Sequence, residues 1–208
     1  MTSPVSVLEA SPVIPVVSMD NPDHAVPVAR ALLAGGIGII EVTLRTGRAL
    51  EALAIIAADV PEILVGAGTV RTPQQADEAV ERGARFVVSP GASPRLLEHL
   101  VSLPVPVLPG VATVSEMLTA LDHGLTEPKF FPAGPAGGPA YLSAVAAPVP
   151  EARFCPTGGV TPENMADYLA LPNVPAVGGS WLTPGSVLAA QDWAQVSAFA
   201  KDARTRAG

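Results

Sequence analysis

The stretch Glu127-Pro128-Lys129-Phe130-Phe131-Pro132-Ala133 is a short apolar run with one lysine between a proline and two phenylalanines. Its apolar residues are nearly continuous rather than alternating, which is typical of a parallel strand that is covered on both faces. Runs of the same kind recur along the whole chain, at residues 13–19, 39–45, 63–68, 85–90, 105–111, 128–133, 153–159 and 175–180. The sequence therefore predicts eight buried, parallel strands.

Helix patterns with recognisable ends separate these runs. Capping residues, several of them followed by proline, predict helix starts at Asn21, Thr72, Ser93, Thr113 and Thr161. Glycines predict helix ends at 35–36, 83 and 124, and a last helix is expected over 186–204.

This alternation of strand and helix patterns predicts an α/β fold. We expect a single (β/α)8 TIM barrel over residues 1–208, with a short N-terminal lead-in helix or arm at 3–15. A leucine-rich solenoid is disfavoured, because its Leu-x-x-Leu-x-Leu consensus is missing.

Composition narrows the class of protein and its partners. The chain has 208 residues, of which 49% are hydrophobic and 15% charged, and no uninterrupted apolar run has membrane-spanning length. The net charge of -7 and the lack of a basic run argue against a nucleic-acid partner. Residues 1–10 lack the basic start and apolar core of a secretory signal, and the single cysteine, Cys155, fits a reducing cytoplasm. We therefore expect a cytoplasmic protein without a membrane partner, and the apolar surplus favours an oligomer interface.

Lys129 is the first candidate catalytic residue. Of the twelve basic residues only Lys129 and Lys201 are lysines, and the rest are arginines. A guanidinium stays charged, whereas a desolvated amine can lose its proton and add to a carbonyl group. One hypothesis is that Lys129 forms a Schiff base with a carbonyl substrate. The alternative is a lysine whose side chain extends from a strand end into solvent.

The run 39–45 carries two charged residues. A strand's period of two places Glu41, Thr43 and Arg45 on one face, with the apolar residues between them on the other. Burial of either charge alone is very unfavourable, so each needs a partner or a ligand. One interpretation is a structural Glu41–Arg45 ion pair. The other is a carboxyl acid/base beside a guanidinium that binds a substrate carboxylate.

Glycine-rich strand ends supply candidate binding residues. Gly66 and Gly68 allow another group to approach the backbone closely, and Thr69 then offers a hydroxyl at the mouth of the barrel. The seventh run ends in Thr157-Gly158-Gly159 and the eighth in Gly178-Gly179-Ser180. Barrels bind phosphate after these two strands, through backbone N–H groups and a helix N-terminus. The two segments together predict a phosphate-bearing substrate.

The sequence does not indicate a metal or a dinucleotide cofactor. His24, His99 and His123 fall on helix patterns, and neither they nor Cys155 approach metal-ligand spacing, so a zinc-dependent aldol cleavage is disfavoured. No Gly-x-Gly-x-x-Gly segment follows a strand, so no dinucleotide is implied. Cys155 is interpreted as a small core residue.

Six motifs occur in order over nearly the whole chain. They are Glu-Val-Thr-Leu-Arg-Thr (41–46), Val-Gly-Ala-Gly-Thr-Val (65–70), Ser-Pro-Gly (89–91), Lys-Phe-Phe-Pro-Ala (129–133), Arg-Phe-Cys-Pro-Thr-Gly-Gly (153–159) and Gly-Gly-Ser-Trp-Leu (178–182). This ordered set resembles the 2-keto-3-deoxy-6-phosphogluconate (KDPG) aldolases, many of which also cleave 2-keto-4-hydroxyglutarate (KHG).

The resemblance implies a class I aldolase that splits KDPG into pyruvate and glyceraldehyde 3-phosphate. It also implies a homotrimer of (β/α)8 barrels with no metal or organic cofactor. By analogy Lys129 is the Schiff-base lysine and Glu41 the general acid/base, acting through a water. By the same analogy Arg45 and Thr69 hold the pyruvyl carboxylate, and Gly158, Gly159, Gly179 and Ser180 hold the phosphate. Thr157 and Gly178, at the same strand ends, are also expected to bind the substrate.

One segment departs from the family pattern. After Phe-Phe-Pro-Ala the family continues with an acidic residue and later a Val-Lys pair, whereas this chain has Gly-Pro-Ala-Gly-Gly-Pro-Ala at 134–140. Substrate preference or the mobility of this loop is expected to differ for that reason, while the chemistry is expected to be the same. Three alternatives to the KDPG aldolase are kept: a sister aldolase for KHG or 2-keto-3-deoxy-6-phosphogalactonate, a barrel that binds a phosphosugar without turnover, and a phosphosugar epimerase.

Overall fold

The computed structural model describes residues 6–208, and the first part of the expected lead-in segment, residues 3–5, lies outside them. In this range the strands are β1 (Val13–Val17), β2 (Ile39–Thr43), β3 (Leu64–Gly68), β4 (Val87–Val88), β5 (Val107–Leu108), β6 (Gly110–Val111), β7 (Lys129–Phe130), β8 (Cys155–Pro156) and β9 (Val177–Gly179). The helices are α1 (Ala25–Ala34), α2 (Ala49–Asp59), α3 (Pro73–Glu81), α4 (Pro94–Val101), α5 (Val114–Asp122), α6 (Gly138–Ala146), α7 (Met165–Leu169), α8 (Gly185–Ala189) and α9 (Trp193–Arg206), with 3₁₀ turns η1 (Val7–Glu9) and η2 (Pro22–His24).

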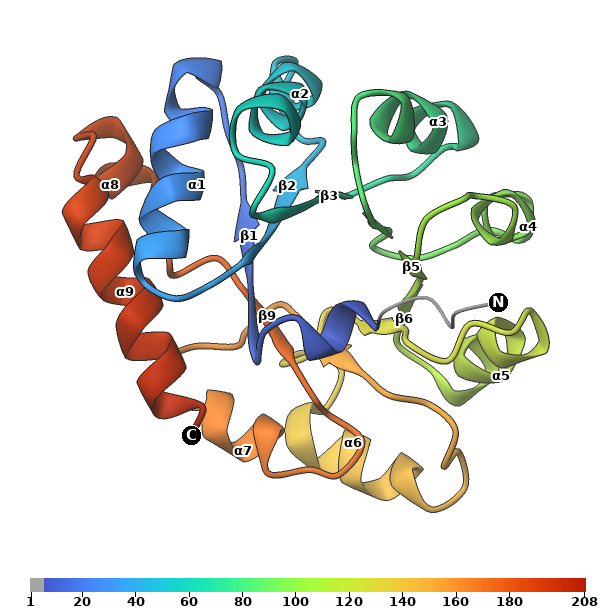
Figure 1. Cartoon of the computed structure of the whole chain (residues 1–208). Coiled ribbons are helices and arrows are strands. Elements are labelled where there is room, and N and C mark those ends of the chain that lie inside the picture. Colours follow the sequence, from blue (N-terminus) through green and yellow to red (C-terminus); the bar gives the residue numbers. More distant parts are fainter. Residues whose placement is uncertain (1–5) are drawn as a thin grey trace.

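The strands form a curled parallel sheet with helices around it (Figure 1). Six strands pair in the order β5-β4-β3-β2-β1-β9, and three pair as β6-β7-β8. The two groups continue into one another: only Pro109 separates β5 from β6, and Thr157 after β8 pairs with Gly178 of β9. Each of the eight predicted runs contains a strand, and the run 105–111 contains both β5 and β6. The predicted α/β class with parallel strands is confirmed.

The predicted helix starts depend on side chains that accept backbone hydrogen bonds. At α5, Thr113 and Glu116 form the full reciprocal capping box. Thr72 caps α3 by accepting from the Gln75 N–H, but the Gln75 side chain accepts from the Arg71 N–H instead of returning to Thr72. Thr72 therefore starts the helix as predicted, but without the reciprocal bond of a capping box.

Two helix predictions at the carboxyl-terminal end of the chain need correction. The helix expected over 186–204 is divided into α8 and α9, because Gln191 has a φ of 54° and the Asp192 side chain caps a new helix. The helix predicted to start at Thr161 begins only at Met165, because the Asn164 side chain accepts from the Thr161 N–H and holds an extra turn.

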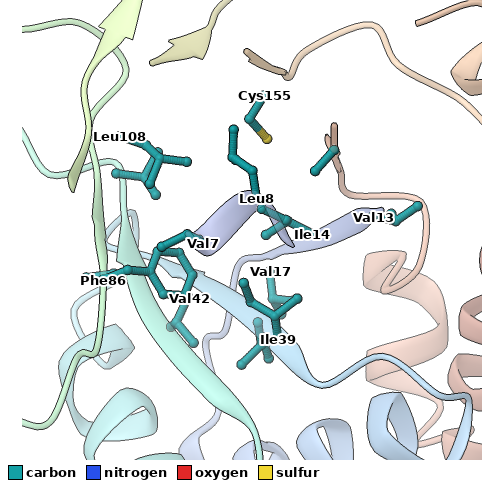
Figure 2. Packing of buried hydrophobic residues seen from close by; sticks show 14 of the residues in the cluster. Val7, Leu8, Val13, Ile14, Val17, Ile39, Val42, Phe86, Leu108 and Cys155 are labelled. Carbon is teal, nitrogen blue, oxygen red and sulfur yellow. The ribbon is translucent and has the colours of Figure 1, made fainter. Parts of the chain in front are cut away.

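The lead-in segment belongs to the core. Val7 and Leu8 in η1 are buried, and Figure 2 shows their side chains in one cluster with Phe86, Leu108 and Cys155. The predicted lead-in helix or arm is thus a 3₁₀ turn whose apolar side chains close the cluster at the amino-terminal ends of the strands. None of the helices formed by residues 6–208 combines the length and apolarity needed to cross a membrane.

Candidate active site

Lys129 and Glu41 meet inside the sheet, although they are far apart in the sequence. Lys129 begins β7 and Glu41 lies in the middle of β2, and the side chain of each is only 4% exposed. The Lys129 Nζ donates to Glu41 Oε1 over 3.3 Å. Two buried opposite charges compensate one another, which a solvated lysine would not need. The alternative that Lys129 extends into solvent is therefore wrong.

The position of Glu41 depends on a glycine in the neighbouring strand. A Cβ atom at Gly68 of β3 would collide with the Glu41 carboxylate, and a Cβ atom at Gly66 would collide with the Phe86 ring. The two glycines were expected to let another group approach the backbone closely. The Phe86 ring does so at Gly66, and the Glu41 carboxylate does so at Gly68. Gly68 therefore provides the space in which the carboxylate reaches Lys129.

Arg45 does not pair with Glu41. The Arg45 side chain is exposed just beyond the end of β2, and its Nε donates to Thr69 Oγ1 over 3.2 Å. Thr69 has a φ of 59°, which is rare for a β-branched residue and is found mainly where the surrounding structure holds it. The hypothesis of a structural Glu41–Arg45 ion pair is wrong, and Arg45 and Thr69 come together at the ends of β2 and β3.

The two glycine-rich segments lie side by side. Thr157 pairs with Gly178, and a Cβ atom at Gly178 would collide with the Thr157 hydroxyl. Gly158 and Gly159 have φ values of 89° and 85°, a region that favours glycine. Ser180 follows β9 and is exposed. The structure thus joins the residues predicted to bind phosphate into one edge, at the carboxyl ends of β8 and β9.

The segment 134–140, which departs from the family pattern, packs against this edge. The Ala133 N–H donates to the Thr157 carbonyl and the Gly134 N–H to the Gly158 carbonyl, both over 2.8 Å. The segment turns through Gly137, which has a φ of 108°, into α6. The chain that follows Lys129 is therefore hydrogen-bonded to Thr157 and Gly158 of this edge.

Two neighbours of Lys129 were not predicted to take part in the site. The Phe131 ring centroid lies 5.5 Å from Lys129 Nζ, a distance at which a ring face attracts a cation. Cys155 is the partner of Lys129 in the β7–β8 register. Burial raises the pKa of the Cys155 thiol to about 12, against the opposing effect of Lys129. The sequence signal for the aromatic contact was the position of Phe131 two residues after Lys129, because alternate residues of a strand lie on the same face.

The histidines lie in the helical layer, as the helix patterns predict. His24 lies in η2 with its ring edge-on to Trp193, His99 lies in α4 and contacts Asp77, and His123 follows α5. Within residues 6–208, no three His, Cys, Asp or Glu side chains are grouped closely enough to hold a metal ion.

Comparison with known proteins identifies relatives across the whole chain. The family model for KDPG and KHG aldolase matches residues 5–199. The KHG/KDPG aldolase of Escherichia coli K12 is 48% identical over 202 residues, which cover 97% of this chain and 95% of that protein.

Solved structures agree with the sequence relatives. The crystal structure of the KDPG aldolase from Legionella pneumophila, with pyruvate captured at low pH as a covalent carbinolamine intermediate, has a TM-score of 0.93 and 44% identity and covers 96% of this chain and 97% of that one. The Zymomonas mobilis ZM4 aldolase with 3-phosphoglycerate has a TM-score of 0.90 and 43% identity, with coverages of 95% and 93%. The resemblance of the six motifs is confirmed. The protein is an aldolase, a carbon–carbon lyase, and the chain belongs to the KDPG and KHG aldolase family.

Proposed function

We propose that the chain cleaves KDPG into pyruvate and glyceraldehyde 3-phosphate through a Schiff base on Lys129. The observation that carries this proposal is the buried Lys129–Glu41 pair, with 3.3 Å between Nζ and Oε1. The Glu41 carboxylate can accept the proton of the Lys129 ammonium as the amine attacks, which is how an adjacent base activates a nucleophile. The relative from L. pneumophila, which holds pyruvate as a covalent carbinolamine, supports the same chemistry.

The proposed reaction begins with a proton transfer from the Lys129 ammonium to Glu41. The neutral amine adds to the C2 carbonyl. Glu41 then returns its proton to the carbinolamine hydroxyl, which leaves as water, so that an iminium forms and Glu41 is again a carboxylate. Glu41, acting through a water, then removes the proton of the C4 hydroxyl. The C3–C4 bond breaks, its electron pair moves into the iminium, and glyceraldehyde 3-phosphate leaves. Protonation of the enamine at C3 and hydrolysis release pyruvate and restore the amine.

No metal or organic cofactor enters these steps, because the iminium is the electron sink. Cys155 also takes no part in them, since burial raises the pKa of its thiol to about 12 and keeps it protonated near neutral pH. A neutral thiol beside Lys129 does not compete with the amine for the carbonyl carbon.

We assign the substrate carboxylate to Arg45 and Thr69. The hydrogen bond from Arg45 Nε to Thr69 Oγ1 orients an exposed guanidinium at the carboxyl ends of β2 and β3. A planar guanidinium binds a carboxylate through two parallel hydrogen bonds, which fixes the position of the neighbouring C2 carbonyl.

We assign the phosphate to the edge at the carboxyl ends of β8 and β9, which we call the glycine edge. It is formed by Thr157, Gly158, Gly159, Gly178, Gly179 and Ser180. The left-handed backbone at Gly158 and Gly159 is of the kind that turns N–H groups towards an anion. The relative from Z. mobilis was solved with 3-phosphoglycerate, a small phosphorylated acid, which supports this assignment.

For the architecture we propose a single-domain (β/α)8 barrel over 1–208 that assembles as a homotrimer in the cytoplasm. The single-residue step between β5 and β6 and the Thr157–Gly178 bridge support a closed ring of eight strand positions. Val101 on α4 is an exposed apolar side chain of the kind found at interfaces. Light scattering coupled to size exclusion should give the mass of three chains, and a monomer mass would contradict the assembly.

Borohydride reduction in the presence of pyruvate tests the proposed function. We expect a stable adduct on Lys129 by peptide mass mapping, with no adduct on the exposed Lys201, which serves as the internal control. Lys129→Arg should abolish both adduct and turnover, because a guanidinium does not form the imine. An unlabelled Lys129 in the wild-type protein would indicate a barrel that only binds its ligand.

KHG is the second candidate substrate, because the family model and the E. coli relative both carry its name. Comparing kcat/KM for KDPG, KHG and 2-keto-3-deoxy-6-phosphogalactonate separates the sister activities. We expect KDPG to give the highest value if the glycine edge binds phosphate. Equal values for KDPG and the unphosphorylated KHG would contradict the phosphate assignment.

A further inference from the structure

The strand beside Lys129 changes its partner halfway along its length. Before Pro109 the chain pairs with β4, in the register Val88 with Leu108. After Pro109 it pairs with β7, in the register Gly110 with Lys129. The two strand groups therefore meet at Pro109, and we call this place the seam.

The Ser89 side chain spans the seam. The ladder between β4 and β5 ends where the Ser89 N–H donates to the Leu108 carbonyl over 3.2 Å. One step further on, Ser89 Oγ accepts the Gly110 N–H over 3.1 Å, and Ser89 is fully buried. A side-chain hydroxyl thus satisfies the backbone donor at the point where the ladder stops.

The backbone at Gly110 is held close to the segment that follows Ser89. A Cβ atom at Gly110 would collide with the backbone of Pro90 and Gly91. Gly110 also borders a cavity of about 190 Å³ that is lined by residues of α4 and α5. The hydrogen bond from Gly110 to Ser89 ties β6 to the end of β4, in addition to the backbone hydrogen bonds that tie this segment to β7.

We propose that the Ser89 hydroxyl is a positioning group for the Schiff-base lysine. It fixes Gly110 against the end of β4, and β6 in turn sets the place of Lys129, whose N–H donates to the Pro109 carbonyl over 2.9 Å. Lys129 Nζ must reach both Glu41 and the substrate carbonyl, so a shift of β6 alters the attack geometry. This inference rests on the proposed role of Lys129.

The test is Ser89→Ala, which leaves the Gly110 N–H buried without its acceptor. We expect the rate of borohydride-trapped adduct formation at saturating pyruvate to fall by roughly 10–100-fold, because small misplacements of reacting groups slow attack steeply. KM for KDPG should change much less, since Arg45 and the glycine edge are untouched. Ser89→Cys, whose sulfur is a weaker acceptor, should give an intermediate rate.

Ser197→Ala is the matched control. It also deletes one serine hydroxyl from a side-chain-to-backbone hydrogen bond, between α9 and the Ala31 carbonyl at 2.8 Å, but in the helical layer. All variants are compared at a temperature where circular dichroism shows them folded. We expect Ser197→Ala to form adduct at the wild-type rate.

The outcomes separate the two proposals. If the wild-type protein forms no adduct on Lys129, the proposed function fails and this inference fails with it. If the wild type forms the adduct and Ser89→Ala does so equally fast, only the positioning role is overturned. Equal slowing of Ser89→Ala and Ser197→Ala would also overturn it, as a general loss of stability. Should Ser89→Ala not fold, Ser89→Cys replaces it, and adduct formation at the wild-type rate in Ser89→Cys would overturn the positioning role.

Discussion

The amino-terminal end of the sheet and its interior both carry ion pairs, but the two pairs differ in burial. At the amino-terminal end Arg153 contacts Glu9 over 3.0 Å and Glu127 over 3.4 Å, and the Arg153 side chain is 40% exposed. In the interior Lys129 contacts Glu41 over 3.3 Å, and both side chains are 4% exposed. The distances are alike, so burial distinguishes the pairs. An exposed pair loses little solvation and contributes little, whereas a buried pair is costly and calls for a functional reason.

Removing the buried charges together should produce the largest effect. In the double variant Lys129→Met with Glu41→Met we expect turnover to fall by several orders of magnitude, because the nucleophile is gone. The free energy of unfolding should stay the same or rise by about 1–4 kcal/mol, as is common when apolar residues replace a buried ion pair. Urea unfolding and a coupled pyruvate assay measure the two effects.

The single variant Lys129→Met is the control for that experiment. It leaves Glu41 buried without a partner and should lower the free energy of unfolding by about 3–5 kcal/mol. If the double variant were as unstable as the single one, the buried pair would be structural, and the contrast between the interior and the amino-terminal end would disappear.

Glu41→Gln should have the second largest effect on turnover. The amide keeps the size of the side chain but removes the base, so we expect turnover to slow by roughly 10²–10⁴-fold. Pyruvate binding, followed by isothermal titration, should persist because Arg45 and Thr69 are unchanged. An unaltered rate would remove Glu41 from the proposed acid/base role.

The sequence predicted both charged residues of the site but not their pairing. The alternation in the run 39–45 gives the face on which Glu41 lies, yet it cannot show which strand lies opposite. Arg45 is close in sequence and was one candidate partner, but β2 ends at Thr43 and the chain turns away before Arg45. The partner of Glu41 is instead Lys129, which lies on a strand far away in the sequence. Gly68 makes this pairing possible because it leaves room for the Glu41 carboxylate.

Features without a local signal were missed. The division between α8 and α9 occurs at Gln191, which adopts a positive φ that glycine or asparagine usually marks. The role of Ser89 depends on the change of strand partner at Pro109, and a proline alone does not show which strands lie on either side. The type of each element and the face on which a residue lies could thus be predicted from the sequence, whereas the contacts between elements could not.

At the amino-terminal end the apolar contacts should matter more than the charges. Leu8→Ala truncates a side chain that is 1% exposed, and we expect it to lower the free energy of unfolding by about 2–5 kcal/mol. Leu118→Ala makes the same substitution at a site that is 49% exposed and should change it by less than about 0.5 kcal/mol. Thermal unfolding of both variants provides the comparison. Similar losses would mean that η1 is not part of the core.

Arg153→Met should have the smallest effect. The Arg153 side chain is 40% exposed where it contacts Glu9 and Glu127, so its loss should lower the free energy of unfolding by less than about 1 kcal/mol. The difference from wild type should shrink further in high salt. Turnover should be unchanged, and this is the more demanding expectation, because Arg153 lies two residues before Cys155 and Glu127 two residues before Lys129. A fall in kcat with unchanged stability would show that the amino-terminal ion pairs help to place Lys129. In that case the amino-terminal end and the interior of the sheet would act as one site, and burial alone would not distinguish a catalytic pair from a structural one.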